Sequence, residues 1–352
     1  MANNWMRSEI PPYSEEALLT GVVADMSAHQ VLCTSPGLAQ FAGAIARFLP
    51  EAAVNCTYLD LYRANLALEY WRDGPANLRI QCNLDLADGE VDVIAFPFSA
   101  SGDAELTRDF LQSGHERLIL GGQMFASTDN SDDTWLGVEL RKIFRKLERR
   151  SCPTGALYVG TKTEPLKKRK NFACEFAFRD HGRLIRACSR PGVFSHRHID
   201  PGARRLIDWM QIDPGARVLD IGCGSGTVAL AAACRADGVN VHAVDSNARA
   251  VECTRGGAEL NGFTNLTVEL NADGNYQGTG EFDLALANPP YYSNFRIARH
   301  FLTAGHQFLR PGGTILLVTK QPQWYQQHMP DWFNELTVMQ RKGYYLLQAV
   351  RP

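Results

Sequence analysis

Short apolar runs alternate with longer segments of helical character along the second half of the chain. The apolar run at 217–221 stops at the glycine-rich sequence GCGSG and continues into the alanine-rich segment 227–235. A strand, a glycine turn and a helix are therefore predicted in this order. Further strands are predicted at 241–245, 266–270, 282–287, 315–319 and 344–350, with helices from 246 to about 261 and over 295–308. This alternation predicts an α/β fold with a parallel sheet.

An internal repeat relates the two halves of the chain. Residues 92–118 align with residues 283–309 without a gap. The identical pairs are Asp92 and Asp283, Arg108 and Arg299, Phe110 and Phe301, Leu111 and Leu302, Gly114 and Gly305, His115 and His306, and Leu118 and Leu309. Upstream, the segment 57–60 resembles the strand that ends at Asp245. We therefore predict a duplicated α/β domain.

The two copies differ at the positions that could carry chemistry. The first copy has SPGLAQF, with one glycine, where the second has GCGSGTV, with three. It also has Phe96-Pro97-Phe98 in the region where the second has Asn288-Pro289-Pro290. We predict a degenerate domain at 1–160, a basic connecting stretch at 161–188 and the chemically competent domain at 189–352.

Composition places the chain among ordinary folded proteins. It has 352 residues, of which 45% are hydrophobic and 21% charged, a balance that argues against disorder and against coiled coil. No apolar stretch reaches the length of a membrane span, and the first residues lack the apolar core of a secretion signal. The nine cysteines are scattered and never spaced as C-x-x-C, so neither a disulfide framework nor a metal site is expected. These features predict a cytoplasmic protein.

Charge is concentrated in the middle of a nearly neutral chain. The formal net charge is −2, yet Lys162 to Arg197 holds ten basic and three acidic residues. The preceding segment 141–150 holds six basic residues and one acidic residue. Such a stretch could hold RNA phosphates, which positions a nucleic acid without reading its sequence. A solvated, charge-rich linker would have the same composition.

The glycine turn is the first candidate binding site. Gly222, Gly224 and Gly226 let the backbone approach a ligand closely and direct helix amides towards it. Asp245, at the end of the next strand, is placed to accept hydrogen bonds from two ribose hydroxyls, although it could simply cap the following helix. Asp273, in the sequence NADG, could contribute to the same site or serve only as a turn residue.

Asn288-Pro289-Pro290-Tyr291 is the sharpest motif. Two prolines after a strand end pairing and fix the backbone, so that the Asn288 side-chain oxygen and the Pro289 carbonyl can face one point. Two converging acceptors suit an exocyclic amine, and Tyr291 offers a face on which a base could stack. A plain turn between a strand and a helix is the alternative.

Together, Asp220 with GCGSG, Asp245, Asp273 and Asn-Pro-Pro-Tyr resemble class I S-adenosylmethionine-dependent amine methyltransferases. The resemblance implies that the glycine turn receives the methionine part of the cofactor, Asp245 its ribose and Asp273 its adenine. It also implies that Asn288, Pro289, Pro290 and Tyr291 orient the acceptor nitrogen. The fold it implies is two tandem Rossmann-like methyltransferase domains, of which the N-terminal copy is degenerate.

A second segment makes the resemblance more specific. The sequence SRPGVFSH from residue 189, followed by Asp200 and Gly202, is similar to bacterial ribosomal RNA guanine-N2 methyltransferases of the RsmC/RlmG type, which carry the methyltransferase small domain. This similarity implies that Phe194 contacts the cofactor and that His196 and Asp200 lie beside the cofactor or the acceptor base. A structural lead-in to the first strand would explain these residues as well. The family usually has Phe-His after Asn-Pro-Pro, whereas this chain has Tyr291-Tyr292, a form also found in enzymes acting on adenine or protein glutamine.

These observations lead to one expected function and several alternatives. The resemblance implies methyl transfer to the exocyclic N2 amine of a guanine in ribosomal RNA, most simply small-subunit 16S rRNA, by a monomer that uses neither a membrane nor a metal. An N-methyltransferase acting on adenine or on a protein glutamine is an alternative. A non-catalytic RNA-binding protein with the same fold is another.

Overall fold

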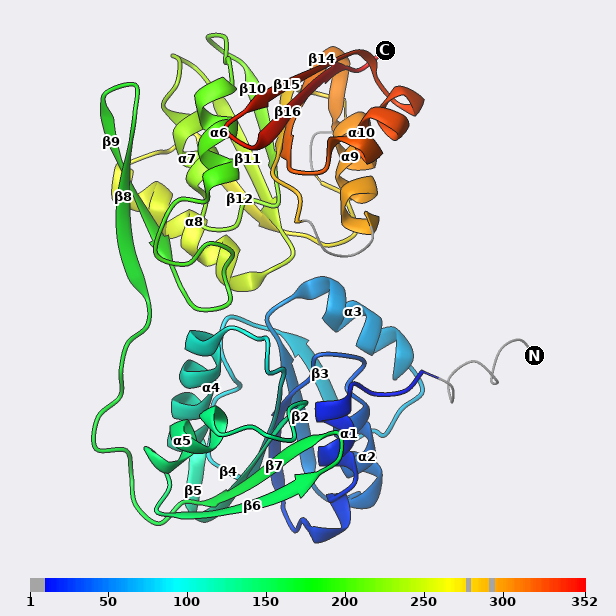
Figure 1. The fold of residues 1–352 in the computed structure, drawn as a ribbon, viewed down its shortest axis with the longest axis vertical. Helices are drawn as coiled ribbons and strands as arrows, with labels where there is room; N and C mark the ends of the chain where they lie inside the picture. The colour runs from blue at the N-terminus through cyan, green and yellow to red at the C-terminus, as the bar shows by residue number, and fades with distance from the viewer. Residues whose placement is uncertain (1–9, 277–279, 291–294) are drawn as a thin grey trace, which may run out of the picture. The chain divides into compact units, whose positions relative to one another are not determined.

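The computed structural model describes residues 10–276, 280–290 and 295–352. The chain divides after Phe172 into two compact units, which are described separately (Figure 1). Each unit contains a seven-stranded mixed sheet. In the described residues, no helix has the length and apolarity needed to cross a membrane.

The C-terminal unit is a three-layer α/β domain. Its sheet has the order β12-β11-β10-β13-β14-β16-β15, with all pairs from β12 to β14 parallel and the last two antiparallel. The strands are β10 (Arg217–Ile221), β11 (Asn240–Asp245), β12 (Leu266–Leu270), β13 (Phe282–Ala287), β14 (Leu309–Thr319), β15 (Asn334–Arg341) and β16 (Tyr344–Val350). The helices are α6 (Pro201–Trp209), α7 (Thr227–Ala233), α8 (Ala248–Asn261), α9 (Arg296–Phe308) and α10 (Pro322–His328), with a short 3-10 turn η2 (Met329–Asp331).

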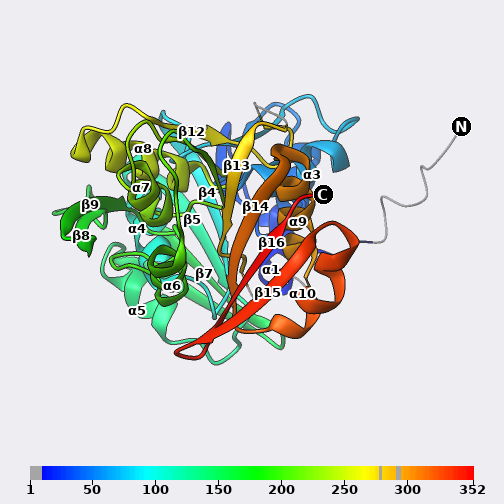
Figure 2. The ribbon, with the colours of Figure 1, turned by 90° about the horizontal axis from the view of Figure 1, so that it is seen from above.

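Alternate side chains of this sheet form two separate cores. Val218 and Leu286 pack with α6, α7 and α8 on one face. Leu219 and Ala287, one position further along each strand, pack with α9 and α10 on the other face. Figure 2 shows these two groups of helices on opposite sides of β13, β14 and β16. The strands are apolar on both faces because helices cover both, as expected for a largely parallel sheet.

The N-terminal unit repeats this topology. Its sheet has the order β3-β2-β1-β4-β5-β7-β6, the same order as in the other unit. The strands are β1 (Gln30–Thr34), β2 (Ala53–Tyr58), β3 (Leu78–Cys82), β4 (Val91–Phe98), β5 (Leu118–Thr128), β6 (Lys146–Cys152) and β7 (Gly155–Thr161). The helices are α1 (Ser14–Thr20), α2 (Gln40–Phe48), α3 (Leu61–Tyr70), α4 (Ala104–Arg117) and α5 (Trp135–Arg141), with a 3-10 turn η1 (Val23–Asp25).

Equivalent side chains perform equivalent structural tasks in the two units. Asp92 accepts hydrogen bonds from the backbone amides of His29 and Gln30 at the start of β1. Asp283 accepts one from the amide of Arg217 at the start of β10, at 2.8 Å. The predicted duplication and fold class are therefore confirmed.

Three features of the C-terminal unit differ from the sequence prediction. Strand β14 begins at Leu309 instead of 315, because Arg310 to Gly313 continue the strand past a register shift against β13. The helix α7 ends at Ala233. The edge strand β15 was not predicted, since its sequence NELTVMQR is mostly exposed and has no apolar run.

The C-terminal unit begins with a two-stranded hairpin. Strands β8 (Cys174–Asp180) and β9 (Arg183–Ser189) pair antiparallel, and β9 lies against α8. Phe178 and Ile185 enter the core beneath α6 and α7. The predicted connecting stretch 161–188 thus includes most of this hairpin, whose alternation of charged and apolar residues suits a strand with one buried face.

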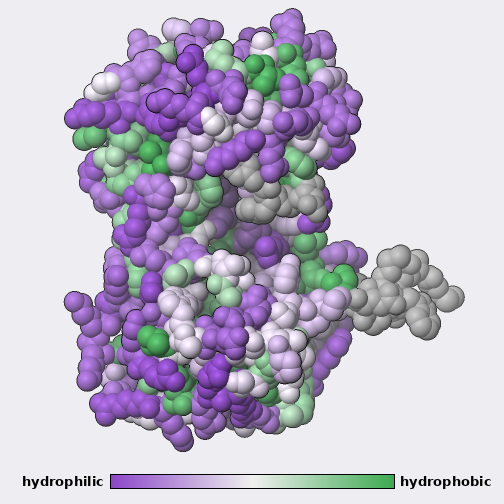
Figure 3. Space-filling model, viewed as in Figure 1, coloured by the Kyte–Doolittle hydropathy of each residue, from purple (hydrophilic) through white to green (hydrophobic). Residues whose placement is uncertain are grey.

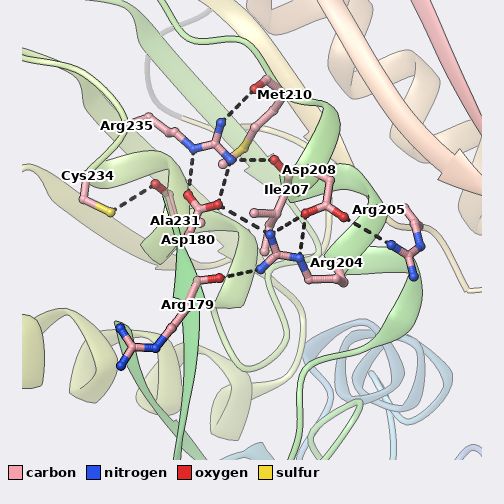
Figure 4. A network of polar contacts seen from close by, with 10 residues as sticks. All are labelled: Arg179, Asp180, Arg204, Arg205, Ile207, Asp208, Met210, Ala231, Cys234 and Arg235. Carbon is pink, nitrogen blue, oxygen red and sulfur yellow. Dashed lines mark hydrogen bonds and ion pairs between the residues drawn. The ribbon is translucent and has the colours of Figure 1, made fainter. Parts of the chain in front are cut away.

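A buried ion pair ties the hairpin to the domain. The Asp180 carboxylate accepts hydrogen bonds from Arg235, at 2.7 Å from Nε and 3.0 Å from Nη2, and both side chains are almost fully buried. Arg204 of α6 also lies 3.6 Å from Asp180 and donates to the Arg179 carbonyl oxygen (Figure 4). The hairpin tip is therefore fixed to both α6 and the end of α7.

Most of the visible surface is hydrophilic. On the face drawn in Figure 3, hydrophobic side chains occur only in small separate areas of each unit. All nine cysteines lie in the described part of the chain, where they are free thiols.

Candidate functional site

The glycine turn connects β10 to α7 in the conformation that its sequence predicts. Gly222, Gly224 and Gly226 have φ values of 76°, 56° and 77°, in the region that favours glycine. A Cβ atom on Gly222 would lie 2.7 Å from the Phe301 ring, and one on Gly226 would lie 2.8 Å from Thr254. A Cβ atom on Gly224 would meet nothing closer than 4.0 Å. The outer two glycines are therefore required by packing, whereas Gly224 leaves open space on its exposed side.

Asp245 holds this turn from the end of the neighbouring strand. Its Oδ2 atom accepts a hydrogen bond of 2.8 Å from the Gly224 amide, and its Oδ1 atom accepts one of 2.8 Å from the Asn247 amide. The N-cap of α8 is Asn247, which accepts hydrogen bonds from the Arg249 and Ala250 amides. Asp245 is therefore not the N-cap of α8, which was its alternative role.

Asp220 is a buried carboxylic acid directly before the glycine turn. It is 2% exposed, and within the described parts of the chain its Oδ2 atom has no hydrogen-bond partner. Burial raises the pKa of Asp220 to about 7, with a further increase from the Asp245 charge. A buried polar atom without a partner is unusual, and it fits a site that a polar ligand completes.

Asp273 lies in an exposed turn after β12. Its Oδ1 atom accepts a hydrogen bond of 2.9 Å from the Asn275 amide, and this bond lowers the pKa of Asp273. The structure thus shows the turn role; a contact with the adenine stays a prediction. A Cβ atom on the next residue, Gly274, would lie 2.8 Å from the His300 ring, so α9 packs closely against this turn.

The segment before α6 lies over the glycine turn. The Phe194 side chain is 58% exposed, and its Cβ atom and carbonyl oxygen are the nearest atoms to the open side of Gly224. Asn247 Nδ2 donates to the Gly192 carbonyl at 2.9 Å, and Arg249 Nη1 donates to the Pro191 carbonyl at 2.9 Å. Phe194, an exposed aromatic residue, is thereby held beside Gly224.

Asn247 and Arg249 also belong to this site, although no motif in the sequence points to them. Arg249 is fully buried, which is rare for an arginine. In the sequence, Arg249 stands out only because the other residues in the first turn of α8 are small or apolar. A charged residue at such a position is usually exposed to solvent. His196 Nδ1 is 2.7 Å from Ser189 Oγ, so this predicted site residue joins the end of β9 to the same segment.

Asn288 follows β13, the strand that pairs with β10. Ile221 and Ala287, the last residues of these two strands, are register partners, so the glycine turn and Asn288 leave the same edge of the sheet side by side. The chain continues outward from β10 to β11 and β12, then returns to β13 on the other side. Ligands bind at such switch points of open α/β sheets.

Among the described residues, the Asn288 side-chain amide contacts Asp200. Its Nδ2 atom donates to Asp200 Oδ2 at 2.9 Å. Pro289 is buried and Pro290 is half-buried. Tyr291 lies outside the described residues, as does Tyr292. The structure therefore brings Asn288 and the glycine turn together, while the contribution of Tyr291 stays a prediction.

The equivalent region of the N-terminal unit is filled by its own side chains. Glu16 of α1 accepts hydrogen bonds from Ser35 Oγ, at 2.9 and 3.0 Å, and from the Phe41 amide, at 3.2 Å. Tyr58 Oη and Trp71 Nε1 donate to carbonyl oxygens of the same loop. Burial raises the pKa of Glu16 to about 7. A ligand in this loop would have to displace a buried carboxyl group, which agrees with the prediction that this copy is degenerate.

Comparisons with known proteins agree with this geometry. Residues 185–348 match the methyltransferase small domain family. Over 172 residues the chain is 33% identical to the ribosomal RNA small subunit methyltransferase C of Chromohalobacter salexigens, covering 46% of this chain and 50% of that protein. It is 29% identical over 180 residues to the uncharacterized protein YbxB of Bacillus subtilis, covering 49% of this chain and 90% of that protein. The alignment thus spans about half the length of the named methyltransferase.

The similarity in fold extends over both units. The solved structure of the T. thermophilus 16S rRNA N2 methyltransferase RsmC, in complex with AdoMet and guanosine, matches with a TM-score of 0.78 and 20% identity. The match covers 99% of this chain and 93% of that chain.

The fold and the matched domain are those of S-adenosylmethionine-dependent methyltransferases, in agreement with the predicted cofactor. Residues 185–348 are therefore similar to the methyltransferases that carry a methyltransferase small domain, and the two tandem Rossmann-like units share the fold of the RsmC structure.

Proposed function

We propose that this protein transfers a methyl group to the exocyclic N2 amine of a guanine in small-subunit ribosomal RNA. The observation that carries the proposal is the position of Asn288 next to the glycine turn, fixed by the pairing of Ile221 with Ala287. This pairing supports the proposal, because it brings the Asn288 carboxamide, which would orient the amine, close to the turn that would hold the cofactor. The ribosomal RNA relatives and the RsmC fold support the same substrate.

The cofactor would be held by residues at the edge of the sheet. Gly224 offers open space beside its backbone, Asp245 would accept from ribose hydroxyls, and Phe194 would cover the bound molecule. Asp220 supplies a buried acceptor next to the turn, and Asp273 is predicted to lie near the adenine. When bound, S-adenosylmethionine supplies a methyl group on a sulfonium, which is a good leaving group.

The chain's own residues would act mainly by orientation. Asn288 Oδ1 and the Pro289 carbonyl oxygen would accept the two amine hydrogens, which directs the nitrogen lone pair at the methyl carbon. The nitrogen–carbon bond forms as the carbon–sulfur bond breaks, and the extra amine proton leaves to solvent. The target guanine would have to be unstacked to reach this position, where Tyr291 could stack on it. No essential general base is required.

Part of the basic stretch is suited to RNA phosphates. Lys167, Lys168 and Lys170 are exposed, and Arg169 pairs with Glu116 at the surface. Lys162 is different, because it is buried and donates to the Leu118 and Glu116 carbonyl oxygens. The proposed phosphate contacts therefore belong to 167–170 and to the exposed arginines of the β8–β9 hairpin, whereas Lys162 has a structural role.

The substrate is tested by following a labelled methyl group. Purified protein is incubated with radiolabelled S-adenosylmethionine and with separated small subunits, large subunits, their naked RNAs or a ribosome-free protein extract. Label in small-subunit RNA that digests to N2-methylguanosine supports the proposal. Label in adenosine or in protein glutamine overturns the substrate and leaves the class of enzyme standing. RNA binding without transfer to any acceptor would favour a non-catalytic role.

A further inference from the structure

Asp200 connects the segment over the cofactor site to the Asn288 motif. Its Oδ2 atom accepts two hydrogen bonds, one of 2.9 Å from Asn288 Nδ2 and one of 2.8 Å from the Ala203 amide. The second bond makes Asp200 the N-cap of α6. One carboxylate oxygen therefore joins two elements that are 88 residues apart in sequence.

A carboxylate decides which way the Asn288 amide faces. An ionised carboxylate only accepts hydrogen bonds, so the atom of Asn288 that faces it must be the amide nitrogen. The oxygen Oδ1 is then directed away from Asp200 Oδ2 and keeps its capacity to accept. A rotation of the amide by 180° would put two oxygens against each other, which is unfavourable in a half-buried site.

The position of Asp200 is itself rigid. Its helix α6 begins with Pro201, a residue favoured at the first helical position. Ala203, Leu206 and Ile207 of this helix are buried in the core of the C-terminal unit. The carboxylate is thus fixed by a packed helix, and a hydrogen bond to it fixes Asn288 in turn.

Gly202 provides the space that this arrangement needs. A Cβ atom at this position would lie 2.8 Å from Asp200 Oδ2 and 3.0 Å from Asn288 Oδ1. Its φ value lies outside the left-handed region, so alanine would be acceptable for the backbone. The absence of a side chain therefore matters for the neighbouring oxygen atoms, not for the helix.

We propose that Asp200 is a positioning residue, which turns the Asn288 amide so that Oδ1 faces the acceptor amine, with Gly202 keeping that oxygen free. This inference rests on the proposed function, because it assigns a role in methyl transfer. It predicts that the helix cap and the orientation of Asn288 can be separated by the choice of side chain at residue 200.

Two substitutions separate these roles. Asp200→Ser retains a good N-cap but is too short to reach Asn288. Asp200→Asn also caps, and its one amide oxygen can accept both hydrogen bonds that Asp200 Oδ2 accepts now. We expect Asp200→Ser to lower kcat for methyl transfer by about tenfold or more while the KM for S-adenosylmethionine changes by less than about twofold. We expect Asp200→Asn to restore kcat to within about threefold of the unmodified protein.

A matched exchange controls for the loss of an acidic cap. Asp103 caps α4 in the N-terminal unit, and Asp103→Ser should leave kcat unchanged. Gly202→Ala should also lower kcat, because its Cβ atom crowds both Asp200 Oδ2 and Asn288 Oδ1. An Asp200→Ser protein with unchanged kcat would overturn the proposal. Equal losses in the Ser and Asn variants would do the same, because they would show a need for negative charge alone.

A second measurement does not depend on activity. In protein labelled with nitrogen-15 at asparagine, the Asn288 side-chain signals are assigned by their absence from Asn288→Ala. Their hydrogen exchange should be slow, should accelerate in Asp200→Ser and should be slow again in Asp200→Asn. Exchange that is equal in all three proteins contradicts the orientation. Slow exchange in a protein that methylates nothing would instead contradict the proposed function and leave the Asp200 contact established.

Discussion

Asp245 Oδ2 lies 2.8 Å from the Gly224 amide nitrogen and accepts its hydrogen bond. This contact joins the end of β11 to the turn after β10. It is made to Gly224, the glycine of the turn that has open space beside it. The same carboxylate is predicted to hold the ribose of the cofactor. Asp245 would therefore both hold the backbone of the glycine turn and supply the negative charge that binds the ribose.

Replacement of Asp245 should impair cofactor binding. Asp245→Ala removes an acceptor for ribose hydroxyls and leaves the Gly224 amide without its partner, so we expect the Kd for S-adenosylmethionine to rise by about tenfold or more. Calorimetric titration measures it. Asp60→Ala is the matched control, because Asp60 follows the equivalent strand β2 of the N-terminal copy and caps α3. The Kd of this variant for S-adenosylmethionine should be unchanged. Equal affinity in Asp245→Ala would show that the cofactor binds elsewhere.

The glycines of the turn should respond differently to alanine. Gly226→Ala adds a Cβ atom 2.8 Å from Thr254 in a left-handed conformation, so we expect it to lower the free energy of unfolding by more than about 2 kcal/mol. Gly224→Ala bears only the conformational cost of about 1–2 kcal/mol but projects into the open space and should weaken S-adenosylmethionine binding. Urea denaturation and titration of both variants test this. A reversed order of stabilities would contradict the packing described.

The buried ion pair at the hairpin should be important for stability. Asp180→Ala leaves the Arg235 guanidinium buried without its partner, and we expect a loss of about 3–5 kcal/mol in the free energy of unfolding. Asp208→Ala, in the exposed ion pairs with Arg204 and Arg205, should cost about 1 kcal/mol or less. Urea denaturation compares the two. Similar losses would mean that the hairpin is not fixed by Asp180.

Stability should depend on pH through Asp220. Burial raises the pKa of Asp220 to about 7, above the ordinary value of 3.8 that it regains on unfolding. Between these values the folded protein binds one more proton than the unfolded chain, so its stability decreases as pH rises from about 4 to 7. Asp220→Asn should remove this contribution.

The comparison with Asp220→Asn is made by urea denaturation at pH 5, 6, 7 and 8. The free energy of unfolding of the unmodified protein should decline relative to the variant up to about pH 7 and then run parallel to it. Glu16→Gln is a positive control, because burial also raises the pKa of Glu16 to about 7. The free energy of unfolding of the unmodified protein should decline in the same way relative to this variant. Parallel curves over the whole range would exclude a raised pKa at Asp220.

The sequence predicts most of the framework because strands and turns depend on local patterns. The strand 217–221, the glycine turn and the strand 282–287 lie where their residues indicate. The duplication is also visible in sequence, because residues such as Asp92 and Asp283 recur at equivalent positions. In the structure these two carboxylates accept hydrogen bonds from backbone amides at the starts of β1 and β10. Strand β15 could not be predicted, since its pairing with β16 comes from the partner strand and not from an apolar run of its own.

The site was only partly predictable for the same reason. Gly222, Gly226 and Asn288 follow from motifs, but the contact between Asn288 and Asp200 joins distant segments and leaves no periodic signal. Arg249 is also invisible in sequence, because a lone charged residue in a helix is normally exposed. Long-range hydrogen bonds of this kind become visible only when the fold is known.

The central claim is tested most directly by single-turnover methyl transfer to small-subunit ribosomal RNA with Asn288→Ala. Asn130→Ala, which removes an exposed carboxamide from the N-terminal unit, is the matched control. The account predicts that the unmodified protein and the control form N2-methylguanosine at equal rates, and that Asn288→Ala is slower by about a hundredfold or more with its affinity for S-adenosylmethionine retained. Equal rates in all three proteins would contradict the account, because they would place the chemistry away from this edge of the sheet.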